Sequence, residues 1–201
     1  MKRAALHNLG CKVNAYETEA MEELLKKDGF DIVAFDQIAD VYVINTCSVT
    51  NIADRKSRQM IHKCKKQNPD ACVVATGCYV QSFGKDIASE LGADIVIGNN
   101  KKNDLVDKIH EFYSKNDTSA SNEPILDFLD INQGNVSYEN MHIEKDSEHT
   151  RAFVKVQDGC NQFCSYCIIP FARGRIRSRT IQERRRMGRK RKRKRKRRRR
   201  R

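Results

Sequence analysis

The sequence predicts an α/β protein whose N-terminal domain, residues 1–115, is an open parallel sheet with helices on both faces. Short apolar runs rich in β-branched residues alternate there with longer stretches of helical periodicity, which is typical of βαβ units. Two of these runs, residues 41–44 and 72–75, contain no charged residue. Strands that are buried on both faces have this composition, and such strands occur in parallel sheets.

Local signals then predict the individual elements in chain order. Strands are expected at residues 4–9, 31–35, 41–44, 72–75 and 94–97. Helices are expected at residues 15–27, 53–67, 83–91 and 102–114. Gly29 and Gly92 follow two of the helices as C-terminal caps, and the Asn68–Pro69 pair ends a third.

The composition changes after the closing helix. Residues 116–149 are dominated by Asn, Asp, Ser and Glu with little periodicity, so we interpret them as a solvated linker. The alternative is that its apolar residues dock on a neighbour; these are Ile125, Leu126, Phe128 and Leu129. Residues 151–156 are expected to form one more strand, which leads directly into a cysteine-rich segment within residues 150–183.

The net charge of +13 comes from the end of the chain. Of the 39 Lys and Arg residues, 16 lie in residues 184–201, which leaves 23 against 26 Asp and Glu in the first 183 residues. Such a run of like charge repels itself, so we expect a disordered tail that would hold RNA, DNA or anionic lipid without selectivity. Because the tail follows abruptly on ordinary sequence, we expect a truncated or frame-shifted C-terminus; the alternative is a native polybasic arm.

The cysteine content and the N-terminus indicate a cytosolic protein. The eight cysteines show no even-spaced pairing, and the apolar stretch after Met1-Lys2-Arg3 is too short for a secretory signal. No run of about 18 apolar residues exists, so we expect no membrane span.

The most informative motif is a C-x3-C-x2-C segment, whose cysteines we call the C-terminal thiol set (Cys160, Cys164 and Cys167). No Asp or Glu lies between residues 159 and 174. The spacing lacks the fourth ligand of a zinc site and differs from the ferredoxin pattern that fills every iron. It therefore indicates a four-iron cluster with one open iron, a partly filled zinc knuckle being the alternative.

A second group of cysteines, the N-terminal thiol set (Cys11, Cys47 and Cys78), follows three predicted strands. Ligands of open parallel sheets bind beyond the carboxyl ends of the strands, so these thiols are expected to meet there and hold a second cluster with an open iron. Gly10 and Gly77 precede two of them and allow a sharp turn. Asn45 and Thr46 are expected to donate to thiolate or sulfide. Cys64 and Cys72 are expected to be buried structural thiols.

Basic residues add two weaker signals. Arg173, Arg175, Arg177 and Arg179 recur at every second position, which in an extended segment puts them on one side. That row would suit phosphate or a cofactor carboxylate, or it would be a solvated basic edge. Residues 55, 56 and 58 of the second helix would contact a nucleic acid or be ordinary surface charge.

With both thiol sets in view, the chain resembles the radical S-adenosylmethionine (SAM) tRNA methylthiotransferases. The similarity rests on residues 8–14, 45–47, 76–78 and 157–179 and extends from residue 1 to about residue 180. The Gly-Cys-Lys-Val-Asn form at residues 10–14 most resembles the branch that acts on N6-threonylcarbamoyladenosine next to the anticodon. The N6-isopentenyladenosine branch is the runner-up.

The resemblance implies a mechanism and a set of partners. The C-terminal thiol set would hold a 4Fe-4S cluster whose open iron binds SAM, and one electron would cleave the sulfonium to give a 5′-deoxyadenosyl radical. That radical would abstract hydrogen from carbon 2 of the adenine, while a second SAM supplies the methyl group. The N-terminal thiol set would hold an auxiliary 4Fe-4S cluster that delivers sulfur. Tyr166 would lie near the cofactor adenine, or would pack in the core of its loop. The implied partners are tRNA and a flavodoxin-like or ferredoxin electron donor, and the implied state is a monomer.

The chain departs from the family after residue 183. Members continue through a partial α/β barrel and a small RNA-binding β-domain, whereas here a polybasic run follows the first barrel strand and its cysteine loop. We therefore expect residues 151–183 not to form a stable catalytic domain alone. Two rival hypotheses stay open: a non-enzymatic iron–sulfur or zinc protein that binds nucleic acid, and a thiol redox protein using Cys164 and Cys167.

Overall fold

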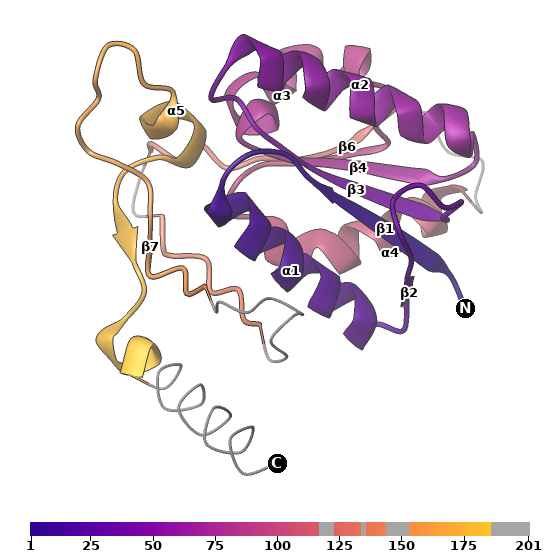
Figure 1. The fold of residues 1–201 in the computed structure, drawn as a ribbon, viewed down its shortest axis with the longest axis horizontal. Coiled ribbons are helices and arrows are strands. Elements are labelled where there is room, and N and C mark those ends of the chain that lie inside the picture. The colour runs from indigo at the N-terminus through magenta and orange to yellow at the C-terminus, as the bar shows by residue number, and fades with distance from the viewer. Residues whose placement is uncertain (117–122, 134–135, 144–152, 186–201) are drawn as a thin grey trace.

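A computed structural model describes residues 1–116, 123–133, 136–143 and 153–185. Its centre is a six-stranded sheet, all parallel, with helices on both faces (Figure 1), which confirms the predicted fold class. The strand order is β2-β1-β3-β4-β5-β6. The strands are β1 (Arg3–Asn8), β2 (Asp31–Ile32), β3 (Val41–Thr46), β4 (Cys72–Gly77), β5 (Ile95–Ile97) and β6 (Ile125–Asp127).

The helices form one layer on each face of the sheet. In Figure 1, α2 (Asn51–Gln67) and α3 (Cys78–Leu91) lie above it, and α1 (Lys12–Lys27) and α4 (Leu105–Asn116) lie below it. A 3-10 turn, η1 (Lys102–Asp104), leads into α4.

Strand β3 shows why both faces need cover. Val41 and Val43 belong to the core beneath the sheet, together with α1 and α4. Tyr42 and Ile44 belong to the core above it, together with α2 and α3. Successive side chains of a strand point to opposite faces of the sheet. A continuous apolar run is therefore stable only where both faces are covered.

The strand order creates a switch point between β1 and β3. From β1 the chain first moves outward to β2 and then crosses back to β3, the pattern of doubly wound sheets. Strands β1, β3 and β4 are therefore neighbours, and their carboxyl ends lie at the same edge of the sheet.

Two predicted boundaries near this sheet are wrong. Helix α3 begins at Cys78, five residues before the expected start at residue 83, because Gly77 (φ +101°, ψ −165°) turns the chain directly from β4 into the helix. Strand β2 covers only Asp31–Ile32 instead of residues 31–35, since it pairs at the sheet edge with the first two residues of β1.

The segment expected to be a solvated linker supplies a strand. Strand β6 pairs in parallel with β5, and Ile125 is 7% exposed. The alternative interpretation, in which apolar residues of this segment dock on a neighbour, is therefore correct for Ile125. Leu126 is 47% exposed on the sheet edge.

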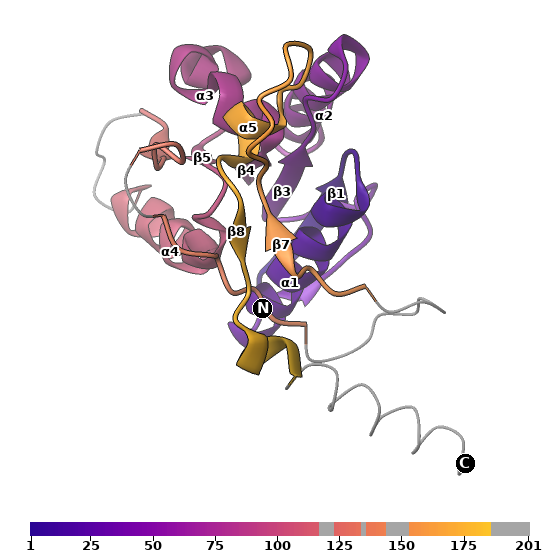
Figure 2. The same ribbon diagram turned by 90° about the vertical axis from the view of Figure 1, so that its left-hand side faces the viewer.

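The C-terminal segment packs against the carboxyl edge of the sheet, as Figure 2 shows for α5 (Ile169–Arg173) and the strand pair β7 (Gln157–Asp158) and β8 (Arg177–Ser178). The strand expected at residues 151–156 is wrong for residues 153–156, which have no regular structure, and residues 151–152 lie outside the described part. Strand β7 pairs antiparallel with β8 rather than starting a parallel barrel. Residues 181–185 are helical, and the polybasic residues 186–201 lie outside the described part.

Candidate functional site: two thiol sets at the carboxyl edge of the sheet

The fold brings the N-terminal thiol set to three adjacent strand ends. Cys11 is the N-cap of α1 after β1, Cys47 directly follows β3, and Cys78 directly follows β4 as the first residue of α3. Cys11 is exposed, whereas Cys47 and Cys78 are 4% and 3% exposed. Three loops that are far apart in the sequence thus carry their thiols to one edge, and the metal-binding role of these thiols stays a prediction.

Two glycines allow these loops to approach each other closely. Gly10 has φ +107°, and a Cβ built on it would lie 2.5 Å from Cys47 Sγ. Gly77 has φ +101°, and its Cβ would lie 2.4 Å from the carbonyl oxygen of Thr46. Both positions require glycine, because any side chain would push the cysteine loops apart.

Asn14 ties the first two cysteine loops together. Its amide nitrogen donates to the carbonyl oxygens of Leu9 and Thr46, both at 2.9 Å. Asn45 Nδ2 in turn donates to the Asn14 carbonyl at 3.0 Å, and Thr46 Oγ1 donates to the Thr76 carbonyl at 2.5 Å. The expectation that Asn45 and Thr46 donate to thiolate is therefore wrong, because their polar groups are used to join the strands and α1.

The C-terminal thiol set lies on a compact loop that α5 closes. The Cys160 N–H donates to the Gly174 carbonyl, and the Cys167 N–H donates to the Cys164 carbonyl, both at 3.0 Å. Gly159 (φ +77°) lets the two arms of the loop meet, since a Cβ there would lie 2.2 Å from the Arg175 carbonyl oxygen. Cys164 is exposed, and the other two thiols are half-buried.

All eight cysteines are free thiols, and they differ in position and exposure. Among the described residues, no three His, Cys, Asp or Glu side chains are grouped closely enough to hold one metal ion. Cys11, Cys47 and Cys78 lie at the ends of neighbouring strands, while Cys64 and Cys72 are fully buried in the core. Burial raises the pKa of Cys64 to about 12 and also raises the pKa of Cys72, so both are inert structural thiols as predicted.

A cluster of buried charges lies beside the thiol loops, and sequence reasoning missed it. Glu17 on α1 is 1% exposed and pairs with three cations. They are Lys102 (3.1 Å), Lys155 (2.5 Å) and Arg173 (2.9 Å). Asp158 pairs with Lys155 at 2.5 Å and with Arg173 at 2.9 Å. Three cations thus surround two buried carboxylates, and Glu139 lies close enough to interact with Lys102 and Lys155.

These contacts shift the ionisation of the groups involved. Burial alone would raise the pKa of Glu17, but Arg173, Lys102 and Lys155 together hold that pKa well below its usual range. Burial likewise would raise the pKa of Asp158, and Arg173 and Lys155 lower it. Burial raises the pKa of the Cys78 thiol, while Arg173 and Lys102 oppose that shift. Glu17 and Asp158 are therefore ionised, and the nearby cations limit the rise that burial causes in the pKa of Cys78.

The stability of the protein is expected to fall as the pH drops below about 4.5. Glu17 titrates near its ordinary pKa of 4.5 in the unfolded chain and well below it in the folded chain. Its contribution is thus fully present above pH 4.5 and is lost as the pH falls through the folded pKa. Urea unfolding at pH 7 and at about pH 3.5 should show that Glu17→Gln loses less stability between the two than the unchanged chain. The difference should approach about 1.4 kcal/mol, the value of one pKa unit, which is the most that one carboxyl can lose over this range. Equal losses in both proteins would contradict this assignment.

The structure corrects the expectation for the four arginines. Arg173, Arg177 and Arg179 are buried, and Arg175 is exposed over the Phe163 ring at 5.1 Å. The residues do not form one row, because α5 ends at Arg173 and Gly174 turns the chain before β8 begins. Neither a phosphate-binding row nor a solvated basic edge is present at these positions.

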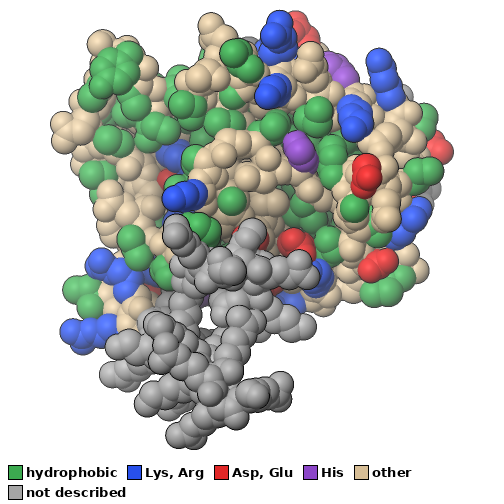
Figure 3. Space-filling view, in the orientation of Figure 1, with side chains coloured by type: hydrophobic (Ala, Val, Ile, Leu, Met, Phe, Trp, Pro, Cys, Tyr) green, Lys and Arg blue, Asp and Glu red, His purple; other side chains and the backbone are tan. Residues whose placement is uncertain are grey.

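Tyr166 does not pack in the core of its loop, because its side chain is 91% exposed. It belongs to a group of exposed apolar side chains on the C-terminal segment that also includes Phe171 and Ile176. Figure 3 shows hydrophobic side chains at the upper left, where this loop lies in Figure 1. The role of Tyr166 in cofactor binding stays a prediction.

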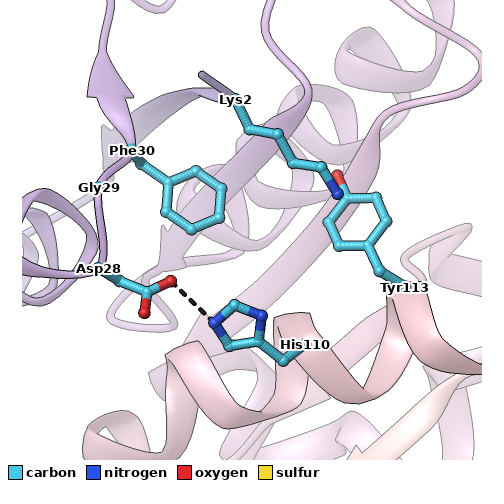
Figure 4. Close-up of a pocket in the computed structure, with 6 residues that line it drawn as sticks. All are labelled: Lys2, Asp28, Gly29, Phe30, His110 and Tyr113. Atoms are coloured by element: carbon cyan, nitrogen blue, oxygen red, sulfur yellow. Dashed lines mark hydrogen bonds and ion pairs between the residues drawn. The ribbon is translucent and has the colours of Figure 1, made fainter.

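A pocket lies at the opposite edge of the sheet, away from both thiol sets. Figure 4 shows its lining residues: Lys2, Asp28, Gly29, Phe30, His110 and Tyr113. Lys2 precedes β1, whereas Cys11 follows it, so the parallel strands separate the two places by their full length. Asp28 and His110 form an ion pair at 2.8 Å across it. None of the described helices is both long and apolar enough to cross a bilayer.

Fold and site together define a doubly wound α/β domain with one cysteine set at its strand ends and a second cysteine set on a loop whose closing helix, α5, docks on that domain. Residues 3–98 match the family described as "Uncharacterized protein family UPF0004". The N-terminal domain is therefore a UPF0004 domain, and the chain is a homologue of the methylthiotransferases, which confirms the resemblance seen in the motifs.

Several curated relatives support this assignment. The chain is 44% identical over 183 residues to "Threonylcarbamoyladenosine tRNA methylthiotransferase MtaB" of Bacillus subtilis, covering 91% of this chain and 39% of that protein. It is 39% identical to the protein of the same name in Aquifex aeolicus, covering 88% and 41%. It is 32% identical to "Ribosomal protein uS12 methylthiotransferase RimO" of Dictyoglomus thermophilum, covering 91% and 40%. The chain thus spans about two fifths of the length of these relatives.

One solved structure shares the fold. It is the radical S-adenosylmethionine methyltransferase TsrM from Kitasatospora setae, with a TM-score of 0.57 at 13% identity over 90% of this chain and 43% of that one. At this identity the likeness concerns the fold alone.

Proposed function

We propose that this chain is the N-terminal part of a radical SAM methylthiotransferase that modifies N6-threonylcarbamoyladenosine in tRNA. The observation that carries the proposal is the convergence of three strand ends bearing Cys11, Cys47 and Cys78, with the segment after Cys167 docked on the same domain through Arg173. This arrangement occurs in a chain 44% identical to a protein named for that activity. The carboxyl edge of a doubly wound sheet is where ligands bind.

The two thiol sets would hold the cofactors. The C-terminal thiol set would bind a 4Fe-4S cluster that has one iron without a protein ligand, and the N-terminal thiol set would bind a second such cluster. When bound, the first cluster supplies the electron that cleaves the sulfonium of SAM. Tyr166, with its ring 91% exposed on the same loop, is suited to stack on the cofactor adenine.

The residues of this chain prepare the edge for that chemistry. Burial of Cys47 and Cys78 keeps water from two of the thiol positions. Arg173 and Lys102, which pair with Glu17, would offset part of the negative charge of a thiolate at Cys78. Gly10 and Gly77 leave no side chain between neighbouring cysteine loops, so a ligand can approach the backbone closely.

Substrate contact would involve helix α2. Arg55, Lys56 and Arg58 are exposed on its first half, and α2 follows Cys47 after a short loop. Lys and Arg side chains bind phosphates without reading sequence, so this helix would position tRNA and leave base selection to other parts of the protein.

Anaerobic loading with iron and sulfide tests the proposal. The loaded chain is expected to bind about eight irons, four for each cluster. Formation of 5′-deoxyadenosine from SAM after reduction is expected of the full-length protein, since residues 151–183 are not expected to form a catalytic domain alone. Stoichiometric zinc without visible absorbance would instead favour a nucleic-acid-binding zinc protein. Substrate choice is decided with the full-length protein on three substrates: tRNA carrying threonylcarbamoyladenosine, tRNA carrying isopentenyladenosine, and ribosomal protein uS12. Methylthio product on the first substrate is the expected result.

A further inference from the structure

Arg173 lies only six residues after Cys167, yet its side chain is buried in the N-terminal domain. It is 4% exposed. Its guanidinium donates from Nη1 to Glu17 Oε1 at 2.9 Å and from Nη2 to Glu17 Oε2 at 3.2 Å. A guanidinium that meets both oxygens of one carboxylate fixes orientation as well as distance.

Arg173 and its neighbour Ala172 connect with every loop of the N-terminal thiol set. Arg173 Nη2 donates to Asn14 Oδ1 at 2.6 Å, and Asn14 holds the loops of Cys11 and Cys47 through the Leu9 and Thr46 carbonyls. The third loop is reached through the residue before Arg173, because Asn99 Nδ2 donates both to the Ala172 carbonyl at 2.5 Å and to Cys78 Sγ at 3.9 Å. Two adjacent residues of the C-terminal segment thus connect, through Asn14 and Asn99, with all three cysteine loops of the sheet.

The docking is reinforced from both sides. Asn99, after β5, donates to the Ala172 carbonyl at 2.5 Å. Asn132, in the segment after β6, donates to the Pro170 carbonyl at 3.0 Å. The backbone of α5 is therefore held by two asparagine side chains, while Arg173 enters the domain between them.

Glu17 is the point at which the two parts of the chain meet. Lys102, which pairs with it from the N-terminal domain, is 1% exposed, and Lys155 and Arg173 pair with it from the C-terminal segment. Removing one partner of a buried ion pair leaves the others uncompensated, which is far more costly than losing a surface pair.

We propose that Arg173 is a positioning residue that, together with Glu17, docks the C-x3-C-x2-C segment on the sheet and fixes the two thiol sets relative to each other. Only the purpose of this docking rests on the proposed function, in which two clusters must face a common substrate. The docking itself is a property of the chain without metal. The docking and the proposed function can therefore be disproved separately.

Hydrogen exchange of the metal-free chain tests the docking. Arg173→Gln and Glu17→Gln are each expected to speed exchange at least about tenfold at the backbone amides of Cys160, Ala172 and Arg179, which are hydrogen-bonded within the segment. The amides of strands β3 and β4 should exchange as in the unchanged chain. Arg173→Lys keeps the charge but loses the bidentate contact with Glu17. Its exchange should therefore be faster than in the unchanged chain and slower than in Arg173→Gln.

Glu22→Gln is the matched control. Glu22 lies on the same helix and pairs with Lys26, but this pair is exposed, so exchange should change less than about twofold. Unchanged exchange in Arg173→Gln would overturn the proposal, as would equal acceleration of β3 and β4. If Glu17→Gln does not fold, Arg173→Gln still decides, because Arg173 lies outside the sheet.

A second readout separates positioning from a purely structural role. When the C-terminal thiol set is replaced by alanine, a redox titration is expected to show only the cluster held by the N-terminal thiol set. Arg173→Gln should lower its midpoint potential with no loss of iron, because a cation next to Cys78 is gone, and Arg173→Lys should restore it. An unchanged midpoint potential would mean that Arg173 does not lie close to this cluster. If no iron binds at all, the proposed function fails, and the exchange experiment still decides the docking.

Discussion

Gly77→Ala is expected to lower the free energy of unfolding by about 3–5 kcal/mol. At φ +101° and ψ −165° the backbone of Gly77 occupies a region that is open essentially to glycine alone. An added Cβ would also lie 2.4 Å from the Thr46 carbonyl oxygen and 2.7 Å from the Thr46 nitrogen. Both atoms belong to the neighbouring strand β3, so neither can move without breaking the sheet. Urea unfolding followed by circular dichroism measures the change.

Gly29→Ala is the control for this prediction. Gly29 also has a positive φ of +91°, but nothing lies within 4 Å of the position of its Cβ. The substitution should therefore cost only the backbone strain, about 1–2 kcal/mol. Equal losses at the two glycines would mean that the contact with β3 is unimportant. Gly77→Ala should also reduce the iron held by the N-terminal thiol set, because the strain lies directly before Cys78.

The buried strands could be predicted from the sequence because their composition has a single physical cause. Strands β3 and β4 are covered on both faces, so they carry uninterrupted apolar runs that no surface element would carry. The start of α3 could not be predicted in the same way. Its N-cap is Gly77, which makes no side-chain capping contact, so residues 78–82 carry no sign of a helix start.

Strand β6 was missed for a different reason. It has three residues, Ile125–Asp127, at the edge of the sheet, and only Ile125 is buried. Its place is set by backbone hydrogen bonds, such as the Ile125 N–H to the Asp94 carbonyl at 2.8 Å. Backbone pairing leaves little trace in the side-chain pattern, so a polar segment can still supply a strand.

Part of the candidate site could likewise be predicted from the sequence, and part of it could not. The positions of Cys11, Cys47 and Cys78 could be predicted, because the strand-end rule depends only on which residues follow the strands. The cluster around Glu17 could not, because charged residues are normally exposed and nothing local marks this one as buried. Its partner Arg173 lies 156 residues away in the sequence, so only the folded chain pairs them.

Alanine replacement of either thiol set is expected to remove about half of the iron that the anaerobically loaded chain binds, about four of eight irons. Each cluster depends on three thiolates, and no other cysteine lies near enough to substitute in the described part of the chain, since Cys64 and Cys72 are buried in the cores. Iron analysis and electron paramagnetic resonance of the reduced chain measure the loss. The N-terminal set supplies its ligands from three separate loops, so its loss should leave the signal of the C-terminal set in place.

The two core cysteines provide the control that makes this result specific. Cys64→Ala and Cys72→Ala remove buried thiols with raised pKa values and should leave the iron content unchanged, although each costs about 1–2 kcal/mol of stability through the lost packing. Loss of iron in either core variant would mean that the sheet interior takes part in binding metal. A full complement of iron after replacement of Cys160, Cys164 and Cys167 would instead mean that the docked loop holds no cluster. In that case the carboxyl edge would carry a single iron site built by the sheet alone.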